Sequence, residues 1–245
     1  MVLDPLLKKT KFCFHGGEAL LYPEIEELLD FMRGRRYSLL TNGILDIKLI
    51  ELVNRYQVPE IGLSLDGRPE TNKLIRGIES FEKTLNLIRQ LKKKTKFKIF
   101  YTISQYNNLD DYNFVKKLAQ DYQIGFNICV LGNPPFFNVN HNIKQLNIDQ
   151  VIIKQEPFAA AFLKWRNGQL NPGCHSIFIY TVIWPDGRVS LCQQKYDLVL
   201  GNVREQEFNF IWNHPRTIAI QKKYAYCNDC WLSCQRPIDL IYLKS

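Results

Sequence analysis

The first half of the chain alternates short apolar runs with longer segments whose apolar residues recur at helical spacing. The short runs are typical of buried strands and occupy residues 11–15, 37–43, 60–67, 96–104 and 124–132. The longer segments are predicted to be helices and occupy residues 22–34, 45–56, 80–94 and 109–122. Strands that alternate with helices along a chain build parallel sheets. The pattern therefore predicts an α/β fold with helices outside a parallel sheet.

Local signals refine the helix boundaries. In the helix predicted over residues 22–34, Pro23 lies near the first turn and Gly34 follows the end. The residues between Gly67 and Ser80 are predicted to form a loop, after which Ser80 is expected to cap the next helix.

The pattern changes after about Gly132. A loop is predicted over GNPPFFNVNHN, and residues 147–167 have a partly helical pattern. The segment IFIYTVIWPDGRVSLCQ contains two strand-like runs joined by Pro-Asp-Gly, which favours a hairpin turn. We therefore expect two domains, at residues 1–169 and 170–245.

Composition and charge restrict the location and the partners. No apolar run is long enough to cross a bilayer, and lysines interrupt the short apolar stretch at the N-terminus, unlike a signal peptide. We therefore predict a cytoplasmic protein with no membrane partner. The net charge is +8, but the densest basic run, Leu91 to Lys98, lies where a helix is predicted to end. Cations there offset the helix dipole, so no nucleic-acid partner is expected.

The cysteines point to metal chemistry. Structural disulfides are unusual in the cytoplasm, and five of the seven cysteines gather in the last third of the chain. These five are Cys174, Cys192, Cys227, Cys230 and Cys234. A Cys-x2-Cys turn puts two thiolates on one side of a loop, and a hairpin cysteine can complete a tetrahedral set. Zinc and an iron–sulfur cluster both accept four thiolates, so the spacing leaves both open.

Polar residues follow the first three predicted strands. HGGE (15–18), TNG (41–43) and SLDG (64–67) come at points that meet at one edge of a parallel sheet. The polar side chains expected on this rim are Glu18, Thr41, Asn42, Ser64 and Asp66. They describe a pocket suited to a small zwitterion and a ribose, in which Glu18 accepts from an ammonium group. Arg76 would either hold a carboxylate with its forked donors or be a solvated loop arginine.

These motifs, in this order, resemble those of radical SAM enzymes that carry a C-terminal SPASM or twitch domain for an auxiliary cluster. HGGEALLYP resembles the GGE motif of the family, and the run from Leu63 to Leu91 resembles its fourth-strand region. Cys174-x12-Gly187-x4-Cys192, with PDGRVSLC and LGNVRE, resembles the opening of the auxiliary domain. The implied fold is a partial (β/α)6 barrel that lacks its first β/α unit, followed by a small cysteine-rich domain of hairpin and helices.

The resemblance implies two cofactors, S-adenosylmethionine (SAM) and an auxiliary [4Fe–4S] cluster. Gly16, Gly17 and Glu18 would hold the amino end of SAM, Ser64 and Arg76 its carboxylate. Thr41 and Asn42 would face the ribose, with Asp66 on the same rim. The implied cluster ligands are Cys174, Cys192, Cys227 and Cys230, with Cys234 as an alternative. Five cysteines suffice for one cluster, which is closer to the twitch form.

One motif of the family is absent. Radical SAM enzymes carry Cys-x3-Cys-x2-Cys upstream of GGE, whereas Cys13 is the only cysteine before Glu18. Our first hypothesis is that a missing N-terminal segment completes a radical SAM enzyme. That enzyme would cleave SAM to a 5′-deoxyadenosyl radical and abstract hydrogen from a substrate such as a peptide or protein.

Two alternatives stay open. One is a degenerate relative that binds SAM or a partner without radical chemistry, and the other is a zinc-stapled interaction module. We favour the enzyme for the intact gene product. No catalytic acid or base is assigned, because the four histidines show no pairing that identifies one.

Overall fold

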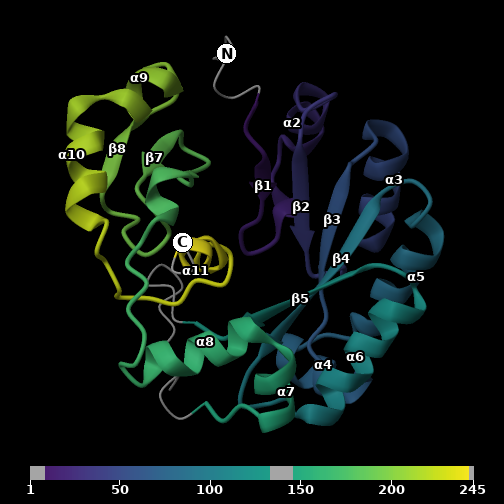
Figure 1. Ribbon diagram of the computed structural model, residues 1–245. Helices are drawn as coiled ribbons and strands as arrows, with labels where there is room; N and C mark the ends of the chain where they lie inside the picture. The colour runs from purple at the N-terminus through teal and green to yellow at the C-terminus, as the bar shows by residue number, and fades with distance from the viewer. Residues whose placement is uncertain (1–8, 133–145, 243–245) are drawn as a thin grey trace. The chain divides into compact units, whose positions relative to one another are not determined.

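The computed structural model describes residues 9–132 and 146–242 (Figure 1). They fall into two compact units, which are described separately. Residues 9–129 and 147–155 form the sheet unit, and residues 130–132, 146 and 156–242 form the cysteine unit. The predicted domain limits, 1–169 and 170–245, stay a prediction. Most of the predicted loop GNPPFFNVNHN lies outside the described residues.

The sheet unit is built on five strands that lie side by side in chain order. They are β1 (Phe12–Phe14), β2 (Tyr37–Thr41), β3 (Glu60–Ser64), β4 (Lys96–Ile103) and β5 (Gly125–Val130). The first four pair in parallel, with Phe14 opposite Leu39 and Thr41 opposite Leu63. This register brings the carboxyl ends of neighbouring strands to one edge of the sheet, as the sequence predicts.

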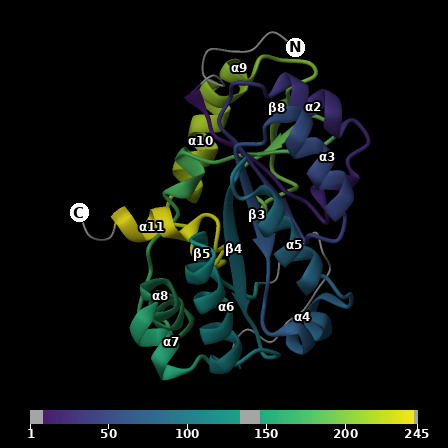
Figure 2. The ribbon, with the colours of Figure 1, turned by 90° about the vertical axis from the view of Figure 1, so that its right-hand side faces the viewer.

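Helices connect the strands. They are η1 (Ala19–Leu21), α2 (Ile25–Phe31), α3 (Asp46–Tyr56), α4 (Pro69–Arg76), α5 (Phe81–Leu91) and α6 (Leu109–Asp121), and α7 (Gln150–Gln155) follows β5. Right-handed crossovers that always step to the next strand put every connecting helix on the same face of the sheet. Figures 1 and 2 show α2, α3, α5 and α6 along that face. The arrangement is that of an open α/β barrel, which confirms the predicted class.

The core lies between the sheet and these helices. Leu39, Ile61, Leu63 and Ile99 on the strands are fully buried, and they face buried residues of α3 and α5 such as Leu49 and Ile88. Each such side chain stabilises the fold by about 1.5–3 kcal/mol relative to an exposed one. The predicted inward positions Phe81, Leu85 and Ile88 of α5 are all buried.

Helix α4 occupies the segment for which the sequence predicts a loop. It begins with Pro69, which suits the first helical turn, and ends before Gly77, whose φ of +71° terminates it in the left-handed region. Ser80 has the N-cap position of α5 but makes no capping bond. Its hydroxyl accepts from the Asn72 amide at 3.0 Å instead. Arg76 is therefore the last residue of a helix.

The cysteine unit combines short helices with a small antiparallel sheet. Its strands β6 (Val182–Ile183), β7 (Arg188–Ser190) and β8 (Val199–Asn202) lie in that order. Its helices are α8 (Pro157–Arg166), η4 (Ser176–Phe178), α9 (Phe208–Asn213), α10 (Pro215–Tyr224) and α11 (Arg236–Tyr242). The predicted Pro-Asp-Gly turn joins β6 and β7, with Gly187 at φ +88°. The first strand is shorter than predicted because residues 176–178 form η4.

Across residues 9–132 and 146–242, no helix has both the length and the apolar character needed to span a bilayer. The cytoplasmic location stays a prediction.

Candidate functional site

Glu18 joins the loops that follow the first two strands. Its carboxylate accepts from the backbone N–H of Leu20 at 3.0 Å and from that of Asn42 at 3.0 Å. The first bond makes Glu18 the N-cap of η1, and the second reaches the loop after β2. Both carboxylate oxygens are therefore engaged with the backbone, and a ligand ammonium group would share them.

Gly16 and Gly17 leave space beside Glu18. Both are exposed, neither has a positive φ, and a Cβ built on either one would meet no atom of the described part of the chain within 4 Å. Neither backbone conformation nor packing therefore requires glycine here. A side chain at either position would fill open space beside the backbone. Glycine keeps that space free, which allows a ligand to approach the backbone closely.

Thr41 and Asn42 use their side-chain oxygens within their own turn. The Thr41 hydroxyl accepts from the Gly43 amide at 3.2 Å, and the Asn42 side chain accepts from the Ile44 amide at 3.0 Å. Gly43 has φ +76°, and a Cβ on it would lie 2.8 Å from the Thr84 hydroxyl. The two predicted ribose-facing residues therefore shape the loop after β2.

Asp66 and Arg76 form an ion pair with each other. Asp66 is 1% exposed, and its carboxylate also accepts from the Thr102 amide at 2.8 Å. Burial raises the pKa of Asp66, whereas Arg76 and the Thr102 hydrogen bonds oppose that rise. Asp66 thus fastens the end of α4 to the sheet from a buried position.

Arg76 keeps donors that Asp66 does not use. A guanidinium has five N–H donors, and the buried Arg76 Nε has no hydrogen-bond partner among residues 9–132 and 146–242. Its side chain is 26% exposed, so part of the group reaches the surface. Ser64, at the end of β3, is half-buried. One of the two expectations for Arg76 is a solvated loop arginine. The structure instead places Arg76 at the end of α4, paired with the buried carboxylate of Asp66.

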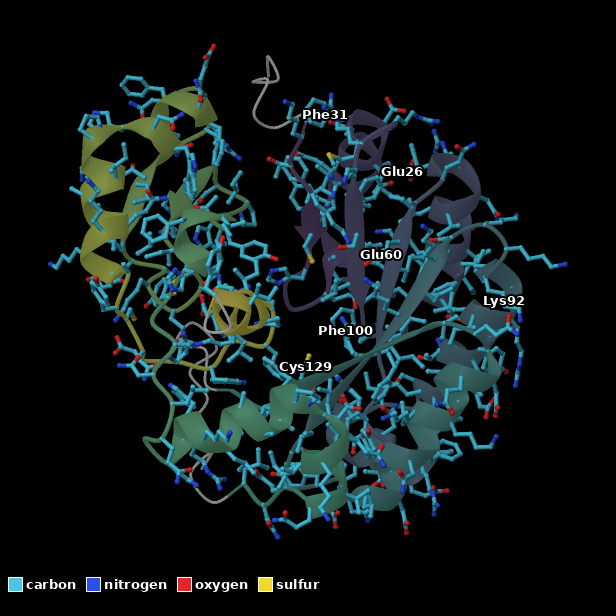
Figure 3. All side chains as sticks on the ribbon, viewed as in Figure 1. Glu26, Phe31, Glu60, Lys92, Phe100 and Cys129 are labelled. Atoms are coloured by element: carbon cyan, nitrogen blue, oxygen red, sulfur yellow. The ribbon has the colours of Figure 1, made fainter. Side chains whose placement is uncertain are left out.

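Four of the five C-terminal cysteines line one small cavity in the cysteine unit. They are Cys174, Cys192, Cys227 and Cys230. Cys174 precedes η4, Cys192 follows β7, and the other two belong to the turn after α10. Cys234 is exposed and is not among the lining residues. Neither is Cys13 of β1 nor Cys129 of β5, which is labelled in Figure 3.

The thiols of this cavity influence one another. Burial raises the pKa of Cys174, Cys192 and Cys230, for Cys230 to about 12. The other three thiols add to the rise at Cys230, and the nearby guanidinium of Arg236 opposes it. The Lys195 amide donates to the Cys192 sulfur at 3.4 Å. Metal binding here would have to displace protons from these buried thiols.

The donor set suits an iron–sulfur or zinc centre, but the thiols are not at ligating distance from one another. Within the described residues, no three His, Cys, Asp or Glu side chains are close enough to hold a metal ion. The cavity has a volume of about 20 Å³, room for roughly one water molecule. The four cysteines fit an iron–sulfur cluster because thiolates are its usual ligands and because all four line the same cavity.

The residues that support this cavity were not predicted from the sequence. Arg236 and Asp239 of α11 are 2% and 0% exposed and tie the cysteine loops together. The indole of Trp165 donates to the Asn228 carbonyl at 3.2 Å and packs on Trp231, with ring centroids 5.5 Å apart. Trp231 directly follows Cys230 in the sequence, and a large aromatic residue next to a cysteine is the feature that could have indicated this packing.

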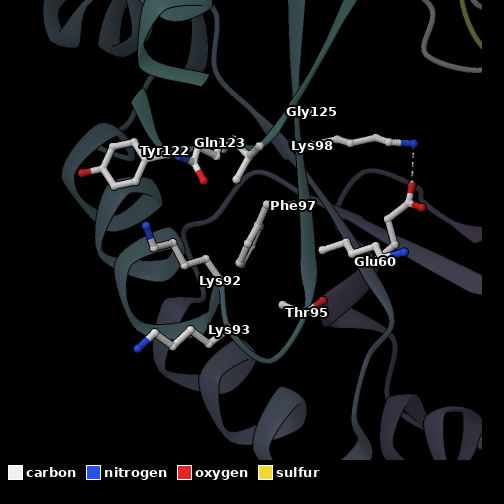
Figure 4. Close-up of a pocket in the computed structure, with 11 residues that line it drawn as sticks. Glu60, Lys92, Lys93, Thr95, Phe97, Lys98, Tyr122, Gln123 and Gly125 are labelled. Carbon is white, nitrogen blue, oxygen red and sulfur yellow. Dashed lines mark ion pairs between the residues drawn. The ribbon is translucent and has the colours of Figure 1, made fainter. Parts of the chain in front are cut away.

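A larger cavity, about 620 Å³, lies at the amino ends of β3, β4 and β5, away from the predicted rim (Figure 4). The basic run after α5 lines one side with Lys92 and Lys93. Glu60 lies on the other side and pairs with Lys98 at 3.2 Å. Lys92 is the C-cap of α5 and Lys93 follows it, which is the placement that the sequence predicts for cations near the helix end.

Comparison with known proteins identifies the family. The Radical SAM superfamily matches residues 6–118, and SPASM, an iron-sulfur cluster-binding domain, matches residues 174–231. The two matches together cover more than half of the chain. Two regions of the chain thus match family models, one of the radical SAM superfamily and one of the SPASM domain. The family resemblance predicted from HGGEALLYP and the cysteine spacing is therefore confirmed.

The radical SAM match and the SPASM match fall on different units. The first extends from before β1 into α6 and includes every predicted SAM-binding residue. The second begins at Cys174 and ends at Trp231, so it includes the four cavity cysteines but excludes Cys234. No curated protein sequence matches the chain.

Solved structures share the fold. Native anSMEcpe with bound AdoMet aligns with a TM-score of 0.61 and 18% identity, over 94% of this chain and 77% of that chain. Streptococcus suis SuiB bound to its precursor peptide SuiA aligns with a TM-score of 0.63 and 14% identity, over 86% of this chain and 56% of that chain. SuiB bound to S-adenosylmethionine gives 0.61 and 12%, with the same coverage. These identities show the fold alone, and this chain spans only 56% of the length of SuiB.

Proposed function

We propose that this chain supplies the SAM-binding sheet and the auxiliary cluster domain of a radical SAM enzyme. The observation that carries the proposal is the cavity lined by Cys174, Cys192, Cys227 and Cys230, in the region that matches an iron-sulfur cluster-binding domain. These four residues would hold one [4Fe–4S] cluster. Such a cluster, when bound, supplies an electron-transfer centre or a Lewis-acidic iron.

The SAM site is proposed for the rim of the sheet unit. Glu18 holds the loops after β1 and β2 together, and Gly16 and Gly17 keep the adjacent backbone open to the amino end of SAM. Ser64 and the unused donors of Arg76 would take the carboxylate, with Arg76 held by Asp66. Thr41 and Asn42 would shape the loop beside the ribose.

Cleavage of SAM to a 5′-deoxyadenosyl radical needs a cluster bound by Cys-x3-Cys-x2-Cys. Residues 1–245 contain no such motif. We propose that a further segment or chain contributes it. A peptide or protein substrate is proposed because a structural relative, SuiB, has been solved with its precursor peptide.

The cluster proposal is tested by anaerobic reconstitution of the full chain, with analysis of iron, sulfide and zinc. The proposal expects a brown protein with equal iron and sulfide. Single Cys→Ser variants at the four cavity positions should lose iron, whereas the matched control Cys234→Ser should keep it. A colourless protein with one zinc would instead establish the zinc-stapled module, and iron retained by the cavity variants would contradict the ligand set.

The SAM proposal is tested separately by calorimetric titration of the purified chain with SAM. Binding that weakens in Arg76→Lys but not in Arg89→Lys, an exposed arginine of α5, would support the rim as the site. Failure of the wild-type chain to bind SAM would contradict it. Binding without cleavage under reducing conditions is the expected result for residues 1–245 alone.

A further inference from the structure

Arg236 is a charged residue in an unusually buried place. It begins α11, visible in yellow in Figures 1 and 2, and is 2% exposed. A buried guanidinium costs free energy unless its donors are satisfied and its charge is balanced. Its partners therefore show what this residue does.

Those partners are the backbone of two separate cysteine loops. The Nε and Nη2 atoms donate to the Cys230 carbonyl at 2.9 Å and 2.7 Å, and Nη1 donates to the Gly173 carbonyl. Gly173 immediately precedes Cys174. One side chain thus bridges the loops that present Cys174 and Cys230, which are far apart in sequence.

Asp239 extends this connection from the same helix. Its Oδ2 accepts from Arg236 Nη1 at 3.0 Å, and its Oδ1 accepts from the Ser176 amide at 2.9 Å. The segment from Gly173 to Ser176 is therefore held on both sides of Cys174. A neutral side chain could have bridged these loops at a lower desolvation cost.

The positive charge of Arg236 suits an anionic ligand in the cysteine cavity. Arg236 lines the same cavity as the four cysteines, together with Lys195, which pairs with Asp229 at 3.0 Å. Four thiolates around an iron–sulfur cluster carry net negative charge, and nearby positive charge makes the added electron more favourable. The buried cation fits an anionic occupant of this cavity.

We propose that Arg236 is a positioning residue of the auxiliary cluster: it holds the Cys174 and Cys230 loops in place and sets a positive charge beside the cluster they bind. This inference rests on the proposed cluster function. It adds two separable roles, a geometric one for the forked hydrogen bonds and an electrostatic one for the charge.

Two variants of the reconstituted full chain separate the roles. Arg236→Lys keeps the charge but loses the fork, and Arg236→Met loses both. Arg188→Met is the matched control, because Arg188 is an exposed arginine of the hairpin in the same unit. The measurements are the rate at which a chelator removes iron and the midpoint reduction potential of the cluster.

Both Arg236 variants should lose iron faster, by roughly 10–100-fold as for other outer-shell partners. Only Arg236→Met should shift the potential to more negative values, and Arg188→Met should match the wild type. If Arg236→Met does not fold, Arg236→Lys and Asp239→Asn test the geometric role by the same iron loss.

Two results would overturn the inference, and they differ. If the wild type binds a cluster through the four cysteines but the Arg236 variants keep its iron and potential, Arg236 has no such role and the proposed function stands. If the wild type binds no iron–sulfur cluster, the proposed function itself is wrong.

Discussion

The carboxylate of Glu18 accepts a hydrogen bond from the backbone amide of Asn42 at 3.0 Å, across 24 residues of sequence. The bond crosses from the loop after β1 to the loop after β2, and Glu18 also caps η1. The glutamate of the GGE motif therefore has a structural partner at each oxygen.

Replacing Glu18 with glutamine should lower both stability and SAM binding. Glutamine has one acceptor oxygen, and its NH₂ group would face a backbone N–H. We expect the free energy of unfolding to fall by about 1–3 kcal/mol. Urea unfolding measures this, with Glu27→Gln on the exposed side of α2 as the control. Equal unfolding midpoints in the two variants would show that the bonds contribute little.

The glycines of the two loops should respond differently to alanine. Gly16→Ala should leave stability unchanged or raise it by about 0.4–1 kcal/mol, because nothing opposes the Cβ and the unfolded chain loses freedom. It should nevertheless weaken SAM binding. Gly43→Ala should cost about 1–2 kcal/mol, because Gly43 has φ +76°.

Thermal unfolding and SAM titration on both variants check this pair. A Gly16→Ala chain that binds SAM like the wild type would remove the argument that the open backbone serves the ligand.

Arg76 should be more important for ligand binding than for folding. Arg76→Lys keeps a cation for Asp66 but has no fork, so the unfolding free energy should change little. SAM affinity should fall about tenfold, the equivalent of one charge-assisted hydrogen bond of about 1.4 kcal/mol. Asp66→Asn should instead destabilise the fold, since it leaves a partly buried guanidinium without its counter-charge. An Arg76→Lys variant that loses more unfolding free energy than Asp66→Asn does would contradict these roles.

Glu60 should make stability depend on acidity. Burial raises the pKa of its carboxyl, but hydrogen bonds from Lys11 at 2.9 Å and from Lys98 outweigh this and lower the pKa below 4.5. A lowered folded-state pKa stabilises above the ordinary pKa, and the effect disappears as the pH falls through the folded value.

The wild type should therefore be more stable than Glu60→Gln at neutral pH by about 0.2–1 kcal/mol, because the pairs are partly exposed. The difference should begin to shrink near pH 4.5 and disappear once the pH is below the lowered folded-state pKa. Chemical unfolding across pH measures it, and a difference that persists in acid would show that packing, not charge, is responsible.

Trp165 should stabilise the cysteine loop through its hydrogen bonds to Asn228, which follows Cys227. Trp165→Phe keeps a ring against Trp231 but removes the donor to the carbonyl and side chain of Asn228. We expect about 1 kcal/mol of destabilisation and faster loss of iron from the reconstituted protein. Trp212→Phe on α9 is the control, and identical iron loss in both would show that the Asn228 bonds do not hold the loop.

The sequence predicts the sheet unit well where periodic apolar residues form each element. All five strands and four helices were located because their buried faces consist of Leu, Ile, Val and aromatic residues. Helix α4 was missed because its one buried residue is Asn72, and Leu74 is exposed. A helix buried through a polar residue has no apolar stripe to detect.

For the candidate sites too, the sequence predicts local features but not tertiary contacts. Cysteine spacing indicated which thiols share a region, since a Cys-x2-Cys turn is a local property. It could not show that Cys234 lies outside the cavity, nor that Asp66 is buried beneath Arg76. Those facts depend on tertiary contacts between segments whose local sequences carry no sign of them. Arg236, between Gln235 and Pro237, would be interpreted as a surface arginine for the same reason.

The position of Arg236 has a consequence for how the protein is made. Arg236 and Asp239 follow every cysteine of the cavity in the sequence. While the ribosome is still adding residues before 236, the side chain that donates to the carbonyl of Gly173 has not been made, and this bond to the loop of Cys174 is missing. A nascent chain that already displays Cys174 and Cys192 thus carries an unfinished site. Arg236 can bridge the Cys174 and Cys230 loops only after the start of α11 has been made.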